Sequence, residues 1–107
     1  MANKEKLAEC EEMIMSVLWS ADEDMTLDEV TEKVNRRFGK DWKIQTVATF
    51  LTRLKHKGYI SIYRVGRYSH YHPEVKLDTY KKAVLKRAKD ILLFESVESM
   101  ADFIKNM

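Results

Sequence analysis

The sequence has few of the residues that cross-link or interrupt a chain: one cysteine, Cys10, one proline, Pro73, and three glycines among 107 residues. A single cysteine excludes an internal disulfide framework and any metal site built from several cysteines. No apolar run approaches the roughly 20 residues that a membrane-spanning helix needs. The start of the chain also lacks the apolar core of a signal peptide. We therefore expect a soluble cytoplasmic protein, with one domain or one small domain plus a helical arm.

Acidic residues are absent from one long stretch. The segment from Trp42 to Pro73 contains no Asp or Glu, although both are common on either side of it, and it holds all three histidines. The net charge of the whole chain is only +2, which by itself says little about partners. Positive charge concentrated in one segment indicates a cationic face, as in proteins that bind nucleic acids.

Apolar residues at helical spacing predict three helices before Gly58. The first runs from about Ala8 to Trp19. The second begins at Thr26, which forms a capping box with Glu29, and ends at Gly39. The third ends before Gly58.

The third helix has two different sides when it is projected at about 100° per residue. The side expected to be buried carries Ile44, Val47, Ala48, Leu51 and Leu54. The polar side carries Thr46, Thr49, Arg53 and His56, with Gln45 and Lys57 at its edges. A polar helix face of this composition is most often simply solvated, so the helix alone does not establish a binding role.

The remaining elements follow from short patterns. Two runs rich in β-branched and aromatic residues, Tyr59–Arg64 and Tyr68–His72, predict a hairpin. The segment Ser20–Met25 has no apolar period and is expected to be a loop. A further helix is expected from about Asp78 to Phe94, and Ser96 can cap a last short one.

Three short helices followed by a hairpin are typical of a winged helix-turn-helix, in which the third helix enters the major groove and the hairpin lies against the neighbouring backbone. We therefore expect a mainly α fold with a small β hairpin, with a DNA-binding domain over residues 1–75 and a C-terminal helical region over residues 76–107. Short hydroxyls and one long guanidinium suit contacts to phosphates and base edges. The predicted DNA-binding residues are Lys43, Gln45, Thr46, Thr49, Arg53, His56, Lys57, Arg64 and Arg67.

The segment from Trp42 to Gly58, followed by Gly66-Arg67 and Tyr71-His-Pro73, resembles the core signature of the penicillinase and methicillin-resistance repressor family, which also includes copper-responsive repressors. Glu11 and the segment Met15–Trp19 are similar to the family's opening motif. The resemblance implies a bacterial winged-helix repressor that dimerises through C-terminal helices and binds an operator with dyad symmetry.

The same resemblance implies roles for single residues. It assigns groove reading to Thr46, Thr49 and Arg53, and wing contacts to Gly66 and Arg67. The chain also departs from the family. Members usually have Lys where this chain has Gln45, and often Ser-Pro where it has Lys43-Ile44. Base preference at that end of the helix is therefore expected to differ.

The C-terminal helices would build the dimer. The apolar residues expected at the two-fold interface are Tyr80, Val84, Ala88, Ile91, Leu92, Val97, Met100 and Ile104. Copper-responsive relatives carry a C-terminal cysteine cluster, which this chain lacks, and we expect no cofactor. Antibiotic-responsive relatives are inactivated by cleavage before a Phe in this region, usually after Asn. Asp102-Phe103 lies in a comparable place, which makes an inactivating protease or a sensor a candidate partner.

Two alternatives remain from the residues alone. A winged helix can serve as a protein–protein interaction module whose basic face meets an acidic partner. His70 and His72 fall on one face of a strand and could serve a metal-responsive regulator, although no carboxylate or third donor lies nearby in the sequence. The chain shows no Ser/His/Asp arrangement, phosphate loop or paired-His motif, and we expect that it is not an enzyme.

Overall fold

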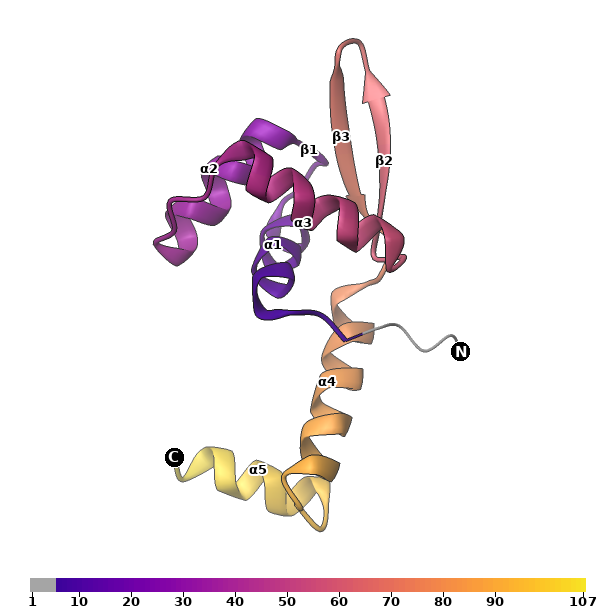
Figure 1. Cartoon of the computed structure of the whole chain (residues 1–107). Helices are drawn as coiled ribbons and strands as arrows, with labels where there is room; N and C mark the ends of the chain where they lie inside the picture. Colours follow the sequence, from indigo (N-terminus) through magenta and orange to yellow (C-terminus); the bar gives the residue numbers. More distant parts are fainter. Residues whose placement is uncertain (1–5) are drawn as a thin grey trace. The chain divides into compact units, whose positions relative to one another are not determined.

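The computed structural model describes residues 6–107, which form five helices and a three-stranded antiparallel sheet (Figure 1). The elements are α1 (Glu9–Ser20), β1 (Met25–Thr26), α2 (Leu27–Phe38), α3 (Ile44–His56), β2 (Ile60–Val65), β3 (Tyr68–Pro73), α4 (Leu77–Ile91) and α5 (Val97–Lys105). The chain divides into two compact units, of which the first ends at Val75 and the second begins at Lys76. The predicted fold class, mainly α with a small hairpin, is confirmed.

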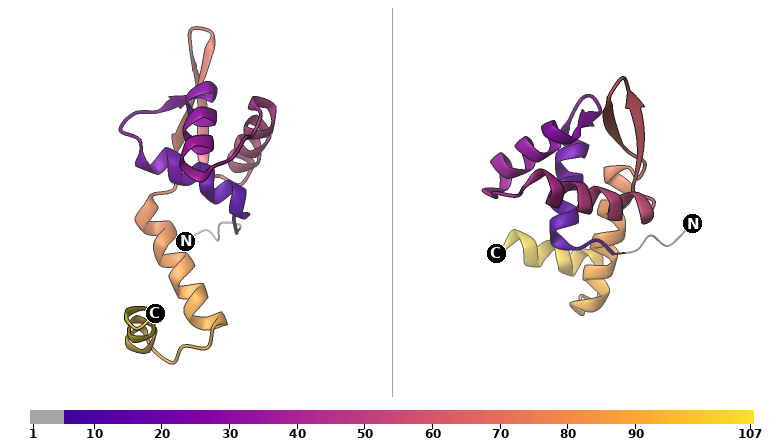
Figure 2. Two further views of the ribbon diagram at one scale, coloured as in Figure 1. Left: turned by 90° about the vertical axis from the view of Figure 1, so that its left-hand side faces the viewer. Right: turned by 45° about the horizontal axis from the view of Figure 1, so that its top comes forward.

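The sheet has one more strand than the sequence predicted. Met25 and Thr26, expected to end a loop and begin a helix, form β1, which pairs with β3 opposite Tyr71 and His70. The strand order is β1-β3-β2, so β3 is the central strand. A strand of two residues is too short to leave an alternating pattern, which is why the prediction missed it. This strand fastens the base of the hairpin, which projects beyond α1, α2 and α3 (Figure 2).

The core of the first unit lies between α1, α2, α3 and the inner face of the sheet. The largest fully buried side chains are Ile14, Met15, Val17, Val30, Val34, Val47, Leu51, Leu54 and the charged Glu11. The predicted apolar side of α3 is confirmed for Val47, Leu51 and Leu54, and Ala48 is half-buried. It is wrong for Ile44, which is 43% exposed because it is the first residue of the helix, before α3 reaches the core.

Local signals set both ends of α2. The Thr26 hydroxyl accepts a hydrogen bond from the Glu29 amide at 3.3 Å, and the Glu29 carboxylate accepts one from the Thr26 amide at 2.9 Å. Gly39 ends the helix in a left-handed conformation, with φ 63°. The predicted capping box and the predicted stop are therefore confirmed.

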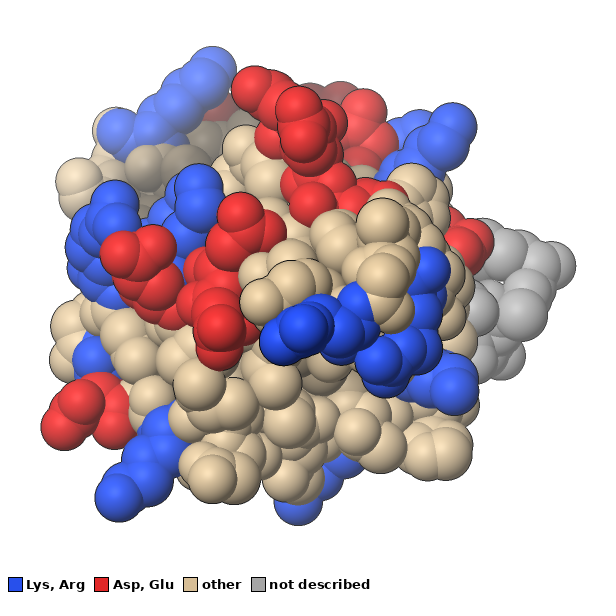
Figure 3. All heavy atoms as spheres, turned by 90° about the horizontal axis from the view of Figure 1, so that it is seen from above, with Lys and Arg blue, Asp and Glu red and all other residues tan. Residues whose placement is uncertain are grey.

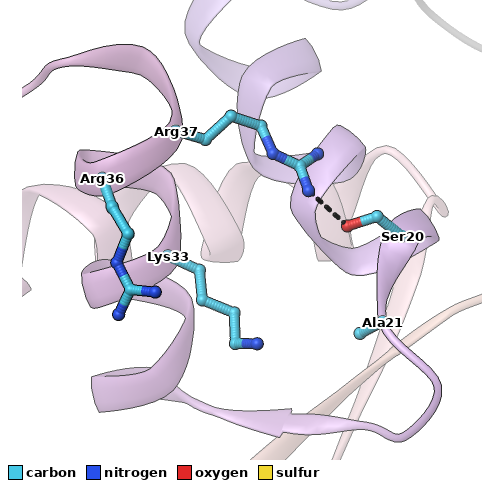
Figure 4. Close-up of a pocket in the computed structure, with 5 residues that line it drawn as sticks. All are labelled: Ser20, Ala21, Lys33, Arg36 and Arg37. Carbon is cyan, nitrogen blue, oxygen red and sulfur yellow. Dashed lines mark hydrogen bonds between the residues drawn. The ribbon is translucent and has the colours of Figure 1, made fainter.

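The C-terminus of α1 is completed by a residue of α2. The last turn of α1 contains no basic residue that could complement the negative end of its dipole. Arg37 of α2 donates to the Ser16 carbonyl at 3.4 Å, to the Ser16 hydroxyl at 3.1 Å and to the Ser20 hydroxyl at 2.9 Å. Figure 4 shows this guanidinium directed at Ser20, with Lys33 and Arg36 lining the same pocket. The two helices are thus joined by charge-assisted bonds as well as by the core.

The second unit contains α4 and α5. Helix α4 was expected to reach Phe94, but it ends at Ile91, because Leu92 caps it and Leu93 adopts a left-handed conformation with φ 65°. Leu92 therefore lies outside the helix. The Ser96 hydroxyl accepts from the Ser99 amide at 3.0 Å, which confirms the predicted cap of α5. Residues 76–107, all of which the structure describes, include no buried residue.

Candidate nucleic-acid interface

The polar side of α3 is open to solvent. Thr49, Arg53 and His56 are exposed and Thr46 is half-buried, on the side of the helix opposite the buried Val47, Leu51 and Leu54. The Thr49 hydroxyl donates to the Gln45 carbonyl at 3.0 Å, and it keeps lone pairs that can accept a hydrogen bond. The Arg53 guanidinium lies 5.7 Å from the centre of the Phe50 ring, which orients it by a cation–π contact. This face presents two hydroxyls and one guanidinium on successive turns.

The N-terminus of α3 is electropositive. No side chain in the described part of the chain caps it, and its first turn contains no acidic residue. Lys43 is the N-cap residue and is exposed, as is Gln45. An uncapped helix N-terminus carries partial positive charge and attracts anionic groups such as phosphates.

The turn before α3 is held by Asn35 of α2. The Asn35 side-chain amide donates to the Trp42 carbonyl at 3.0 Å, and its oxygen accepts from the Trp42 amide at 3.0 Å. The Trp42 ring meets the Phe50 ring edge-on, with centroids 5.3 Å apart. The spacing between α2 and α3 is therefore set by specific contacts on both sides of the turn.

The hairpin formed by β2 and β3, called the wing below, has a two-residue tip. Gly66 and Arg67 join the strands, and Gly66 takes φ 62°, which only glycine adopts at little cost. Arg64 donates to the Arg67 carbonyl at 3.0 Å, so its guanidinium braces the tip. Both arginines are exposed. The wing thus brings two cations to its end.

Lys57 is placed differently from the other predicted contacts. Its ammonium nitrogen lies 2.7 Å from a carboxylate oxygen of Glu11, which is only 1% exposed, and it also donates to the Lys6 carbonyl at 3.3 Å. Burial raises the pKa of Glu11, but hydrogen bonds from Lys57 and the Ala8 amide and the charges of Lys57 and Arg53 outweigh it, so the pKa is lowered below 4.5. Among residues 6–107, Lys57 alone of the predicted contacts pairs with a carboxylate. The Lys57 ammonium group is therefore engaged within the fold.

The base of the wing contains a second acid that the sequence pattern did not reveal. Asp24, just before β1, accepts a hydrogen bond from the Tyr63 hydroxyl at 2.7 Å and lies 2.9 Å from the His72 ring nitrogen Nδ1. The ring of Tyr63 also stacks on His70 across the strands, with centroids 5.5 Å apart. The hydrogen bond to Asp24 raises the pKa of His72 above 6.5.

The surroundings of the wing histidines bear on the metal alternative. A carboxylate does lie beside the wing histidines, because the fold brings together residues 48 positions apart in the sequence. Even so, residues 6–107 contain no group of three or more His, Cys, Asp or Glu side chains able to hold a metal ion. On the face seen from above in Figure 3, basic and acidic side chains form separate groups.

Three helices with an exposed polar face on the third, followed by a basic hairpin, define a winged helix-turn-helix protein. The family model described as penicillinase repressor matches residues 7–107, so the chain belongs to the penicillinase repressor family. The resemblance predicted from the sequence is thereby confirmed. No curated protein sequence matches the chain.

Solved structures share the fold. The DNA-binding domain of the repressor BlaI is 25% identical, with a TM-score of 0.62, over 75% of this chain and 94% of that one. The monomeric form of Bacillus licheniformis BlaI in complex with the blaP half-operator is also 25% identical, with a TM-score of 0.60 and the same coverage. A MarR/EmrR family transcriptional regulator from Acinetobacter sp. ADP1, 22% identical over 92% of this chain and 69% of that one, shares the fold with a TM-score of 0.51.

These comparisons confirm two further predictions. The winged-helix fold is shown by the neighbours, and the family and its fold neighbours are transcriptional regulators, not enzymes. Within residues 6–107, no helix is long and apolar enough to cross a bilayer.

Proposed function

We propose that the chain is a sequence-specific transcriptional repressor that binds double-stranded operator DNA as a homodimer. Membership of the penicillinase repressor family and the repressor neighbours support a DNA-binding repressor. The observation that carries the proposal is the face of α3, where Thr46, Thr49 and Arg53 follow an uncapped helix N-terminus. The BlaI neighbour solved with a half-operator supports DNA as the partner.

In this proposal α3 lies in the major groove. Arg53 is long enough to bond bidentately to a guanine, and Thr49 and Thr46 approach phosphates or base edges one and two turns earlier, respectively. Lys43 and Gln45 meet the backbone where the helix enters the groove, and His56 contacts it where the helix leaves. Arg53 therefore supplies base preference, and the N-terminal residues supply affinity.

The wing would contact the neighbouring backbone or a narrow minor groove. Arg67 is the stronger candidate, because Arg64 is engaged with the Arg67 carbonyl and orders the tip. Such a contact recognises a phosphate or the shape of the groove, and it contributes little to the preference for particular bases.

The second unit is proposed as the dimerisation region. Its exposed apolar residues include Val84, Ile91, Leu92, Val97 and Ile104, with Ile91 66% and Leu92 63% exposed. The predicted interface also includes Tyr80, Ala88 and Met100, which are half-buried. Exposed apolar area of this extent marks an interaction site, and a two-fold interface would cover the same area on both protomers.

Dimerisation would determine the form of the operator. Two copies of α3 related by a two-fold axis read two half-sites of opposite orientation, about one or two helical turns apart. We propose that repression results from occupying such an operator.

Cleavage between Asp102 and Phe103 would inactivate the dimer only after local unwinding of α5. The peptide bond lies within that helix, and the centroids of the Phe103 and Phe94 rings are 5.6 Å apart.

The proposal is tested by titrating salt against binding to random duplex DNA and to duplexes selected by the protein from a random pool. The affinity should fall steeply with salt, with a slope of about −0.9 per phosphate contacted. Arg53→Ala should cost about 1–3 kcal/mol on the selected sequence and relax its base preference, whereas Arg67→Ala should weaken binding to all sequences alike.

Three outcomes would contradict the proposal in different places. An absence of duplex binding at low salt would remove DNA as the partner and favour the protein–protein module. Unchanged operator binding by Arg53→Ala would show that α3 is docked differently. A selected sequence without dyad symmetry would argue against the dimer.

A further inference from the structure

We propose that the ion pair between the buried Glu11 and the half-buried Lys57 is a positioning device for α3. This inference rests on the proposed function, since what the pair positions is the face that would read DNA. Lys57 follows α3 directly and, as a cation beside the reading face, resembles a phosphate contact in the sequence. In the fold its ammonium group is directed at α1.

The geometry shows an attachment at each end of α3. At the N-terminal end the Asn35 side chain makes two hydrogen bonds to the backbone of Trp42. At the C-terminal end the Lys57 ammonium joins Glu11 at 2.7 Å and the Lys6 carbonyl at 3.3 Å. Apolar packing between these points allows small rotations and sliding of a helix, whereas polar contacts at both ends have defined directions and lengths.

Stability alone is a poor explanation for this pair. Removing two charges from water costs about as much as their attraction returns, so well-packed apolar residues of similar volume are often as stable. The Glu11 oxygen that accepts from Lys57, Oε1, also accepts from the Ala8 amide at 2.8 Å. The pair therefore fixes three segments against one another: the start of α1, the residues just before it and the end of α3.

The reading face is directly connected to this point. Arg53 lies one turn before Lys57, and the Lys57 amide donates to the Arg53 carbonyl at 3.0 Å. The charge of Arg53 also acts on the Glu11 carboxylate. A small shift of the end of α3 would therefore move the proposed base-reading guanidinium first.

The test replaces both charges at once, because a single replacement would leave the other charge buried and unpaired. The double variant Glu11→Leu/Lys57→Met is compared with the wild type and with Lys55→Met. Lys55 is an exposed cation of the same helix turn that forms no ion pair within residues 6–107, so its replacement is a matched control. Lys57→Arg keeps the charge and should behave as the wild type. If the double variant does not fold, Glu11→Gln/Lys57→Met, which also removes both charges, replaces it.

The first measurement is hydrogen exchange without DNA. In the double variant, the amides of α3 should exchange about tenfold faster while those of α2 are unchanged, as expected for a locally loosened element. Lys55→Met should leave both unchanged. Equal exchange in α3 of the double variant and the wild type would overturn the proposal, whatever the protein binds.

The second measurement is the ratio of affinities for the selected duplex and for random duplex, at several salt concentrations. The ratio should fall about tenfold in the double variant, roughly the discrimination of one bidentate base contact, with the salt slope unchanged. A slope reduced by about 0.9 with an unchanged ratio would make Lys57 a phosphate contact and overturn the proposal. A wild type that binds no duplex refutes the proposed function instead, and the exchange measurement still decides whether the pair holds α3.

Discussion

Asp24 is a single residue that connects segments far apart in the sequence. Its two carboxylate oxygens hold both strands of the wing, one through the Tyr63 hydroxyl and the other through the His72 ring. Burial raises the pKa of Asp24, but these two hydrogen bonds and the charges of His72 and His70 together outweigh it, and the pKa falls below 3.8. One side chain thus couples the base of the wing to the segment before β1.

The Asp24–His72 pair should make the wing sensitive to pH. The pKa of His72 is raised above 6.5, so its contribution to the free energy of unfolding is complete below pH 6.5 and is lost as pH rises through the raised value. The pKa of Asp24 is lowered, so its contribution is complete above pH 3.8 and is lost as pH falls through the lowered value. The pair therefore contributes fully between these limits.

An NMR titration of the His72 ring checks this prediction. In Asp24→Asn the titration midpoint of His72 should move down toward 6.5, because the neighbouring carboxylate no longer favours the protonated ring. An unchanged midpoint for His72 in the variant would show that the pair is absent in solution.

At the scale of elements, two threonine hydroxyls bond to the helix backbone in opposite directions and have different roles. The Thr26 hydroxyl accepts from an amide at the start of α2, where the helix has no partner of its own. The Thr49 hydroxyl donates to a carbonyl within α3 that the helix already satisfies. Thr26 therefore contributes to the stability of an element, and Thr49 is available for a contact outside it.

The paired variants Thr26→Ala and Thr49→Ala separate these roles. Thr26→Ala should lower the free energy of unfolding by about 1 kcal/mol through loss of the cap. Thr49→Ala should change it by less than about 0.5 kcal/mol, as for an exposed substitution, and should weaken binding to the selected duplex. Denaturant unfolding and a binding titration on each variant measure both quantities. Equal destabilisation by the two substitutions would contradict the distinction.

The same contrast explains what the sequence could predict. The caps at Thr26 and Ser96 and the stop at Gly39 depend on residues within one turn of each other, and local spacing is enough to find them. The Glu11–Lys57 and Asp24–His72 bonds join residues 46 and 48 positions apart, and β1 pairs with β3 across a similar distance in the sequence, so no local pattern encodes these contacts. The segment from Trp42 to Pro73 contains no acid, yet the fold brings the carboxylates of Glu11 and Asp24 to it. Because the sequence pattern does not show these carboxylates, it predicts Lys57 as a DNA contact.

At the scale of the whole molecule, the two units differ in how they bury apolar area. The first unit encloses a core of fully buried side chains, whereas no residue from Lys76 onward is fully buried. A small helical unit without a core cannot offset the entropy of ordering its chain through propensity alone. Association of two copies would supply the missing burial and would place two reading helices on one operator.

Ile91→Glu tests the proposed dimer. Burying an unpaired carboxylate among the apolar residues of α4 is energetically costly. The variant should therefore sediment as a monomer under conditions in which the wild type sediments as a dimer. Its affinity for the full operator should fall by roughly 10²-fold or more, because the second half-site no longer binds as part of the same molecule. Thr79→Glu is the matched control, since Thr79 is an exposed residue of α4 outside the predicted interface and the substitution adds the same charge. The control should remain dimeric. A dimeric Ile91→Glu protein, or a wild type that stays monomeric at operator-binding concentrations, would contradict the assignment of α4 to the interface.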